Sequence, residues 1–234
     1  VIIDEAQDYS PFQLFFLKRL FPRAKMTALG DLNQAIYAHA SVLQQSSVFS
    51  DLYGAEESEL ITLEQSYRST RQIVEFTREM IPGGEVIVPF NREGEMPEVH
   101  LVDDIEELHA SLEAMIGQLR ADGYESIAVI CKTAEESKQA YDRLSAKLPA
   151  KLIKKTTLSF EKGVHVIPAY LAKGVEFDAV LIYDGSDRKY TREAERKLFY
   201  TACTRAMHLL RIYSVGEPSR FIREASKSTY ILVP

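Results

Sequence analysis

The sequence predicts an α/β protein with a parallel sheet flanked by helices. Strand-like and helix-like segments alternate regularly along the chain, and parallel strands need crossover connections of this kind. The apolar runs are short and continuous, such as Val1-Ile2-Ile3 and Ala179-Val180-Leu181-Ile182-Tyr183, as in strands that are buried on both faces. With 234 residues, 46% hydrophobic and 26% charged, the composition is that of a globular protein with a sizeable core.

The first quarter of the chain predicts the order strand, helix, strand, helix. Residues 1–6 are an apolar run that ends in acids, and Ser10 and Pro11 supply an N-cap and a first-turn proline for a helix through Phe21. A second apolar run covers 24–29, and a helical pattern covers 34–53. The polar residues that follow place a domain boundary near residue 56.

Further strands and helices are expected to alternate from residue 60 to the end. The predicted strands are 60–63, 98–102, 126–131, 164–169, 179–184 and 209–214. The predicted helices are 69–81, with Ser69 as its cap, 105–121, 134–148 and 192–205. Residues 81–97 are rich in Pro, Gly and Glu, which predicts an irregular connection.

Charge and cysteine usage restrict the class of protein. A net charge of -6 argues against strong stand-alone binding of nucleic acid but leaves room for a local basic patch. No apolar run approaches the ~20 residues that cross a bilayer. Cys131 and Cys203 lack metal-ligand spacing, so we expect a cytoplasmic protein with neither disulfide nor zinc. The start at Val1, inside an apolar run, predicts a fragment of a longer protein.

Asp4 and Glu5 stand where the first apolar strand ends. The end of a strand fixes the direction of these carboxylates, and Mg²⁺ beside a nucleotide phosphate prefers oxygen ligands. The pair is therefore a candidate metal and catalytic site. Taken alone, the pair is equally well explained as two acids that are exposed to water where a strand ends.

Residues 1–8, Val-Ile-Ile-Asp-Glu-Ala-Gln-Asp, resemble motif II of the UvrD/Rep family of superfamily 1 helicases. Residues 30–37, Gly-Asp-Leu-Asn-Gln-Ala-Ile-Tyr, resemble its motif III. The resemblance implies that Asp4 binds Mg²⁺, that Glu5 is the general base for the attacking water and that Gln34 senses the γ-phosphate. It also implies that Tyr37 stacks on a base of nucleic acid, with a buried core tyrosine as the alternative.

Three later segments resemble motifs IV, V and VI of the same family: residues 63–70, 172–178 and 198–206. The resemblance implies that Tyr67 lies against adenine, that Arg68 and Arg205 reach the γ-phosphate, that backbone near Gly174 approaches the nucleotide, and that Glu176 contacts the ribose. The structural alternatives are an exposed arginine at a helix entry for Arg68 and, for Arg205, a charge at a helix C-terminus, worth ~0.3–1 kcal/mol.

Together the motifs imply parts of two RecA-like domains that share one nucleotide. Residues 1–55 would be the end of the first domain, with motifs II and III, and residues 56–234 the second, with motifs IV to VI. ATP and Mg²⁺ are then the cofactors of the full-length protein. Closure of the domains on ATP would bring arginine charge to the reacting phosphate and couple hydrolysis to motion.

Three features depart from the family pattern. The phosphate-binding loop G-x-x-x-x-G-K-[ST] occurs nowhere in the chain, so we expect a missing N-terminal half of the same protein to carry it. The chain alone is then expected to be inactive as an ATPase. Pro168 and Tyr170 stand where the family usually has Thr and His. The roughly 95 residues between Thr70 and Val166 leave no room for the large domain that UvrD-type enzymes insert there.

In three respects the chain resembles the HelD-type branch, helicase-like ATPases that bind bacterial RNA polymerase: its compactness, its acidic charge and the sequence of residues 172–180. The sequence therefore favours a motor that acts on RNA polymerase and nucleic acid, with DNA as the expected polymer. Two alternatives stay open. One is a single-strand DNA translocase or DNA helicase of UvrD type, and the other is a non-enzymatic helicase-like binding module.

Overall fold

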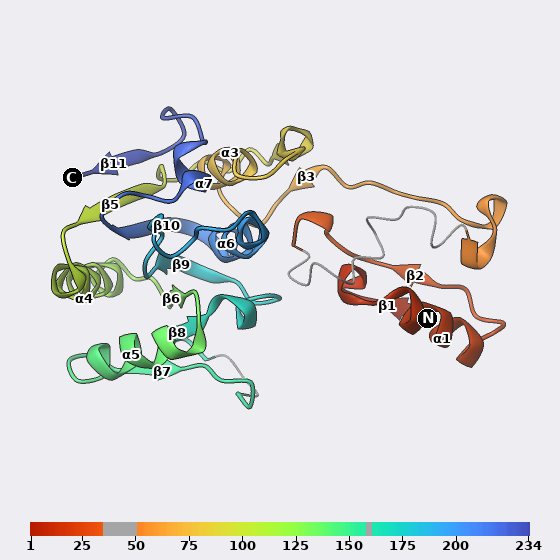
Figure 1. Cartoon of the computed structure of the whole chain (residues 1–234), viewed down its shortest axis with the longest axis horizontal. Coiled ribbons are helices and arrows are strands. Elements are labelled where there is room, and N and C mark those ends of the chain that lie inside the picture. Colours follow the sequence, from red (N-terminus) through yellow and green to blue (C-terminus); the bar gives the residue numbers. More distant parts are fainter. Residues whose placement is uncertain (35–50, 158–160) are drawn as a thin grey trace. The chain divides into compact units, whose positions relative to one another are not determined.

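The computed structural model describes residues 1–34, 51–157 and 161–234 (Figure 1). The described chain divides into two compact units, Val1–Leu63 and Glu64–Pro234. Each unit has its own core and is described by itself. The assignment of these parts to two RecA-like domains, with a boundary near residue 56, stays a prediction.

In its described residues the first unit contains a small parallel sheet and the helix α1 (Pro11–Leu20). Strand β1 (Ile2–Ile3) pairs with β2 (Thr27–Ala28), and α1 lies between them in sequence. Ser10 caps α1 as predicted, because its hydroxyl accepts from the Gln13 amide while the Gln13 side chain accepts from the Ser10 amide. The helix predicted over 34–53 lies mostly outside the described residues.

The second unit is built on a parallel sheet. In the described residues its strands lie in the order β11-β5-β10-β9-β6-β8-β7, and every pairing among them is parallel. The predicted α/β fold with a parallel sheet is confirmed. The strands are β5 (Glu98–Val102), β6 (Ser126–Cys131), β7 (Ala150–Leu152), β8 (Gly163–Pro168), β9 (Phe177–Ile182), β10 (Ala206–Val215) and β11 (Ile231–Val233). A separate short pair joins β3 (Gln65–Ser66) to β4 (Val88–Pro89).

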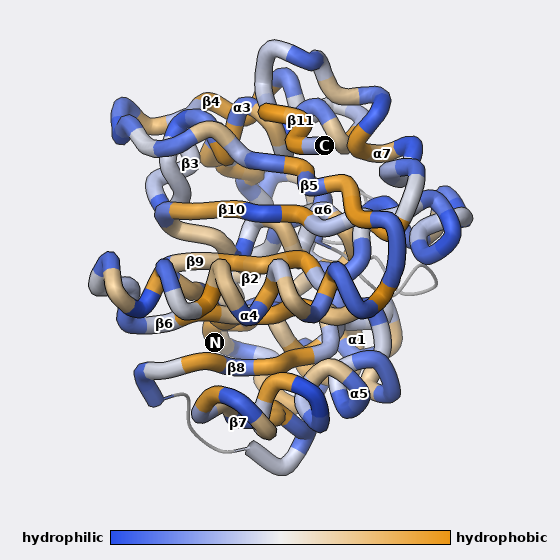
Figure 2. Tube along the Cα trace, turned by 90° about the vertical axis from the view of Figure 1, so that its left-hand side faces the viewer, coloured by the Kyte–Doolittle hydropathy of each residue, from blue (hydrophilic) through white to orange (hydrophobic). Residues whose placement is uncertain are grey.

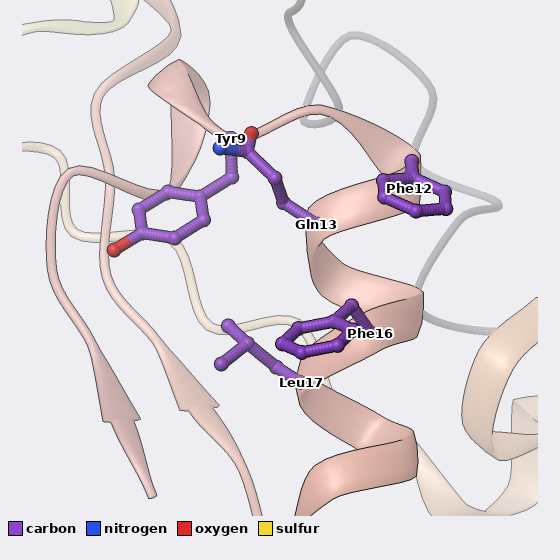
Figure 3. Close-up of a pocket in the computed structure, with 5 residues that line it drawn as sticks. All are labelled: Tyr9, Phe12, Gln13, Phe16 and Leu17. Atoms are coloured by element: carbon purple, nitrogen blue, oxygen red, sulfur yellow. The ribbon is translucent and has the colours of Figure 1, made fainter.

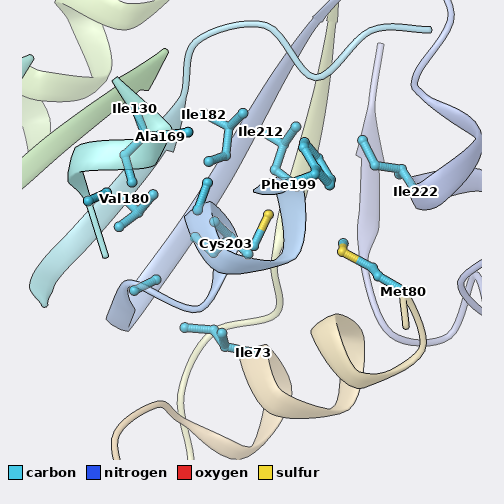
Figure 4. Close-up of a cluster of buried hydrophobic side chains, with 14 of the residues drawn as sticks. Ile73, Met80, Ile130, Ala169, Val180, Ile182, Phe199, Cys203, Ile212 and Ile222 are labelled. Atoms are coloured by element: carbon cyan, nitrogen blue, oxygen red, sulfur yellow. The ribbon is translucent and has the colours of Figure 1, made fainter. Parts of the chain in front are cut away.

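Helices cover both faces of this sheet, because its central strands are apolar on both sides (Figure 2). Along β6, Ala128 and Ile130 face one core and Ile127 and Val129 face the other. The first core contains residues of α3, α6 and α7 (Figure 4), and the second contains residues of α4 and α5. The helices are α3 (Arg71–Arg78), α4 (Ile105–Ala121), α5 (Ala134–Leu144), α6 (Arg196–Cys203) and α7 (Arg220–Arg223).

Some predicted boundaries were wrong. The strand expected over 60–63 does not form, because this run has no pairing strand in the described chain and its leucines are exposed. Ser69 does not cap α3; its hydroxyl donates to the Ala206 carbonyl, and Thr70 takes the N-cap position. The helix expected over 134–148 ends at Leu144, and the one over 192–205 is a 3-10 turn followed by α6.

An ion-pair network lies at the carboxyl ends of β6 and β9. Lys132 directly follows β6, and its Nζ lies 2.9 Å from Oε1 of Glu195, which also accepts from Nη2 of Arg192 at 2.7 Å. Lys189 forms a second pair with Glu136. Burial alone raises the pKa of the Glu195 carboxyl, but the hydrogen bonds from Lys132 and Arg192 outweigh it and lower the pKa to about 2.

In the part of the chain described here, no helix is long and apolar enough to cross a membrane.

The Glu195 network predicts acid-sensitive stability. A carboxylate whose folded pKa is about 2 contributes stability above its unfolded pKa of 4.5, and this contribution is lost as pH falls toward 2. We expect Glu195→Gln to lower the free energy of unfolding by about 2–3 kcal/mol at pH 7 and by progressively less from pH 5 downward. Denaturant titrations at several pH values measure this, with the exposed Glu125→Gln as a control that changes little. A Glu195→Gln effect independent of pH would contradict it.

Candidate functional site

Asp4 and Glu5 lie at the carboxyl end of the parallel sheet of the first unit. Asp4 follows β1 directly, is exposed, and its Oδ1 accepts from the Glu5 amide at 2.9 Å. Glu5 has φ 52° and ψ 41°, and among the described residues it alone combines a side chain with a positive φ. Such a left-handed conformation costs of order 1 kcal/mol or more and is typical of functional sites. The chain therefore turns sharply at the predicted general base.

Gln7 joins this turn to the loop that follows β2. Its side chain is fully buried, its Nε2 donates to Glu5 Oε2 at 2.6 Å, and its Oε1 accepts from the Asp31 amide at 3.1 Å. Asp31 in turn accepts at Oδ2 from Gln34 Nε2 at 2.8 Å. The structure thus brings Asp4, Glu5 and Gln34 to one end of the sheet. Sequence reasoning assigned no role to Gln7 or Asp31, although both stand inside the quoted motifs.

In the second unit, motif IV is fastened to the start of β10. The Ser69 hydroxyl donates to the Ala206 carbonyl at 2.6 Å, and the Thr70 amide donates to the Met207 carbonyl at 3.1 Å. The preceding residues are then presented at the surface: Tyr67 is 60% exposed, and its hydroxyl donates to Gln65 Oε1 at 2.6 Å.

Arg68 and Glu176 form an ion pair at the amino end of the sheet. Arg68 Nε lies 2.8 Å from Glu176 Oε1, and Glu176 directly precedes β9. Gly174 has φ +78°, in the left-handed region that glycine adopts without strain, and a Cβ there would meet nothing within 4 Å. Motifs IV and V are therefore in contact through Arg68 and Glu176, two side chains to which the sequence analysis gave different roles.

Arg205 is buried just before β10. Its Nε donates to the Thr201 carbonyl at 3.0 Å, its Nη2 donates to the Thr204 hydroxyl at 3.2 Å, and its own carbonyl accepts from the Phe177 amide at 2.9 Å. The last bond sets Arg205 beside the residue that follows Glu176. Motif VI thus lies at the same amino end of the sheet as Arg68. Tyr37 lies outside the described residues.

Comparison with known proteins gives the family. A model of the UvrD/REP helicase N-terminal domain matches residues 1–43, and a model of the UvrD-like helicase C-terminal domain matches residues 163–213. The solved C-terminal domain of a possible DNA helicase from Lactobacillus plantarum WCFS1 is 33% identical, with a TM-score of 0.62, over 71% of this chain and 98% of that one. The chain belongs to the UvrD-like helicase family.

A curated relative supports this placement. A probable DNA helicase from Mycoplasma pneumoniae is 37% identical over 27% of this chain and 16% of that protein. The UvrD-like chain therefore spans a small part of that relative's length. Asp4, Glu5 and Gln34 fall in the segment matched by the N-terminal model, whereas Glu176 and Arg205 fall in the segment matched by the C-terminal model.

A surface depression in the first unit of this UvrD-like chain is lined by none of the candidate residues. It is lined by Tyr9, Phe12, Gln13, Phe16 and Leu17 (Figure 3). Phe12 and Phe16 are exposed along α1, and none of the lining side chains is a carboxylate or a cation. This depression therefore offers no groups for phosphate chemistry.

Gln7 is predicted to stabilise the first unit through its two hydrogen bonds. Gln7→Leu leaves the Glu5 carboxylate and the Asp31 amide without this partner, which costs about 1–2 kcal/mol. We expect amide hydrogen exchange across residues 1–9 and 27–34 to become roughly 5- to 30-fold faster. Mass spectrometry measures this, with strands of the second unit as internal reference and the exposed Gln118→Leu as the matched control. Unchanged exchange in the first unit would show that Gln7 only fills space.

Proposed function

We propose that this chain is part of an ATP-driven, helicase-like motor that acts on nucleic acid. The observation that carries the proposal is the linked set in the first unit, where Glu5 and Gln34 are joined through Gln7 and Asp31 beside Asp4. Phosphoryl transfer to water needs a metal ligand, a base for the water and a polar group at the phosphate. The activity belongs to the longer protein that carries this chain.

In this proposal Asp4 holds Mg²⁺ and Glu5 accepts the proton of the attacking water. The described residues contain no group of three or more His, Cys, Asp or Glu able to hold a metal unaided. An exposed strand-end carboxylate such as Asp4 fits Mg²⁺, which proteins usually hold by one or two carboxylates together with phosphate oxygens and water. Bound Mg²⁺ would neutralise phosphate charge. Gln34, held by Asp31, would donate toward the γ-phosphate.

The second unit supplies the remaining roles. Arg68 and Arg205 would stabilise the charge that develops on the γ-phosphate, and Tyr67 would lie against the adenine. Glu176 would contact the ribose, with the backbone of Gly174 close to the nucleotide. The Arg68 and Glu176 side chains already meet at 2.8 Å, which supports a single binding region on this unit.

We infer that RNA polymerase is the protein partner, because the sequence of residues 172–180 resembles HelD-type proteins and the net charge is -6. The compact second unit supports this: the described residues 71–157 form α3, β4, β5, α4, β6, α5 and β7 within that unit. A single-strand DNA translocase or helicase is the main alternative, and a non-enzymatic binding module is the third. We infer a cytoplasmic location, which the buried free thiols of Cys131 and Cys203 support.

An ATPase assay on the longer protein tests the proposal. We expect Mg²⁺-dependent turnover that Arg205→Ala lowers by about 10³- to 10⁵-fold, as for other arginine fingers. Single-stranded DNA, RNA and RNA polymerase are added separately, and the strongest stimulator identifies the partner. The 234-residue chain alone is expected to show no turnover. Turnover that is insensitive to Arg205→Ala would remove this residue from the site, and absence of turnover in the longer protein would favour the binding module.

A local basic patch supports contact with nucleic acid. Residues 147–173 contain six lysines and a single acid, Glu161, in a chain of net charge -6. Lys147, Lys151 and Lys162 form ion pairs, but exposed Lys154 and Lys155 have none in the described part of the chain. The Lys155 ammonium lies 5.9 Å from the centroid of the Tyr170 ring. Cations beside an aromatic ring suit a phosphate backbone and a stacked base, which is the role this proposal gives to Lys155 and Tyr170.

The patch predicts a salt-dependent contribution to binding. Replacing both Lys154 and Lys155 by Gln removes two phosphate contacts, so the slope of log K against log salt should fall in magnitude by about 1.4 for a single strand. Fluorescence anisotropy of a labelled oligonucleotide with the longer protein measures the slope. The double variant Lys138→Gln with Lys227→Gln is the charge-matched control. Equal slopes for the two double variants would show that the patch makes no phosphate contact.

A further inference from the structure

Residues 88–94, here called the strap, run alongside motif IV in the second unit. Strand β4 pairs with β3 in parallel register, Gln65 with Val88 and Ser66 with Pro89. The Phe90 amide then donates to the Ser66 carbonyl at 3.0 Å, and the Arg71 amide donates to the Arg92 carbonyl at 2.7 Å. The strap therefore follows motif IV from before Tyr67 to the first turn of α3.

Side chains lock the strap in place. Arg92 donates from Nη1 to the Arg68 carbonyl at 3.0 Å, and its Nη2 lies 2.7 Å from Nδ1 of His208. Glu93 accepts from Arg71 and from Gln72, at 2.9 and 2.6 Å. A Cβ on Gly94 would lie 2.4 Å from Thr70 Cγ2, so a side chain there would force the strap away. The backbone on both sides of Tyr67 is thus held by the strap.

The strap places a second aromatic ring beside Tyr67. The ring centroids of Phe90 and Tyr67 are 5.0 Å apart, with 41° between the ring planes. Phe90 is 41% exposed and Tyr67 is 60% exposed, and neither belongs to a buried core cluster of the described residues. The pair therefore contributes little to the core, and its exposed part offers aromatic surface on which a planar base can stack.

We propose that Phe90 is a second base-stacking residue and forms, with Tyr67, the platform for the adenine of the nucleotide. The inference rests on the proposed function, in which Tyr67 lies against adenine and Arg68 reaches the γ-phosphate. The strap then has two effects: it fixes the Tyr67–Arg68 backbone through Arg92, and it supplies an aromatic contact of its own. Stacking accepts any base, so the platform contributes affinity rather than discrimination between purines.

Steady-state kinetics of the longer protein test the platform. We expect Phe90→Ala to raise KM for ATP roughly 5- to 150-fold, the equivalent of one base stack, with kcat within about twofold, since the contact is the same in ground and transition states. Phe90→Trp should restore KM. The inhibition constant of tripolyphosphate, which has no base, should not change. Phe12→Ala, which removes an exposed phenylalanine from α1, is the matched control and should leave all three quantities unchanged.

The outcomes separate this inference from the function on which it rests. If Phe90→Ala weakens the binding of ATP and the binding of tripolyphosphate equally, Phe90 only supports Arg68 and the platform is wrong. If neither changes, Phe90 has no part in binding, and the platform is wrong while the proposed function stands. If the unmodified longer protein does not turn over ATP, the proposed function fails and the platform fails with it.

Discussion

The candidate site of the second unit depends on three successive backbone carbonyls at the start of β10. Those of Arg205, Ala206 and Met207 accept from Phe177, Ser69 and Thr70 respectively. In a regular strand successive carbonyls point to opposite sides, so two neighbours could not both bind motif IV. The irregular register between Ala206 and Leu209 removes this restriction, and β5 pairs with β10 only from Arg211 onward. A local irregularity in one strand thus gathers motifs IV, V and VI.

The two units present their candidate residues at opposite ends of their strands. Asp4 follows β1, which is the usual position for ligand-binding groups in parallel sheets, whereas Glu176 and Arg205 precede β9 and β10. The carboxyl end of the large sheet is instead occupied by the ion pairs of Lys132 and Lys189. Because these charges already neutralise one another, that end offers little to an anionic ligand. The general rule for open sheets therefore indicates the end of the second unit opposite to its candidate residues.

Sequence patterns predicted elements best where local signals agreed. The helix 105–121 was placed correctly because Asp104 is a strong cap, accepting from two backbone amides, and its apolar residues follow the helical period. The strands 98–102 and 126–131 were equally clear. Other predictions were wrong for tertiary reasons. Ser69 donates to a carbonyl 137 residues away instead of capping its helix, and residues 60–63 have no strand to pair with in the described chain. The motifs predicted the candidate residues, but the links through Gln7 and the strap depend on tertiary hydrogen bonds that no sequence pattern indicates.

Burial and hydrogen-bond partners differ among three arginines of the second unit, and they decide which side chain is available to bind an anion. The Arg211 side chain is 6% exposed and pairs with both Glu95 and Glu98, so it is committed to contacts within the fold. Arg68 has a 62% exposed side chain and pairs with Glu176, whose side chain is 33% exposed, and such surface pairs contribute only ~0–1 kcal/mol. Exchanging this carboxylate for a phosphate oxygen therefore costs the fold little. The geometry allows Arg68 to engage an incoming anion without disturbing the core, whereas Arg205, buried against its own helix, would have to give up bonds to Thr201 and Thr204.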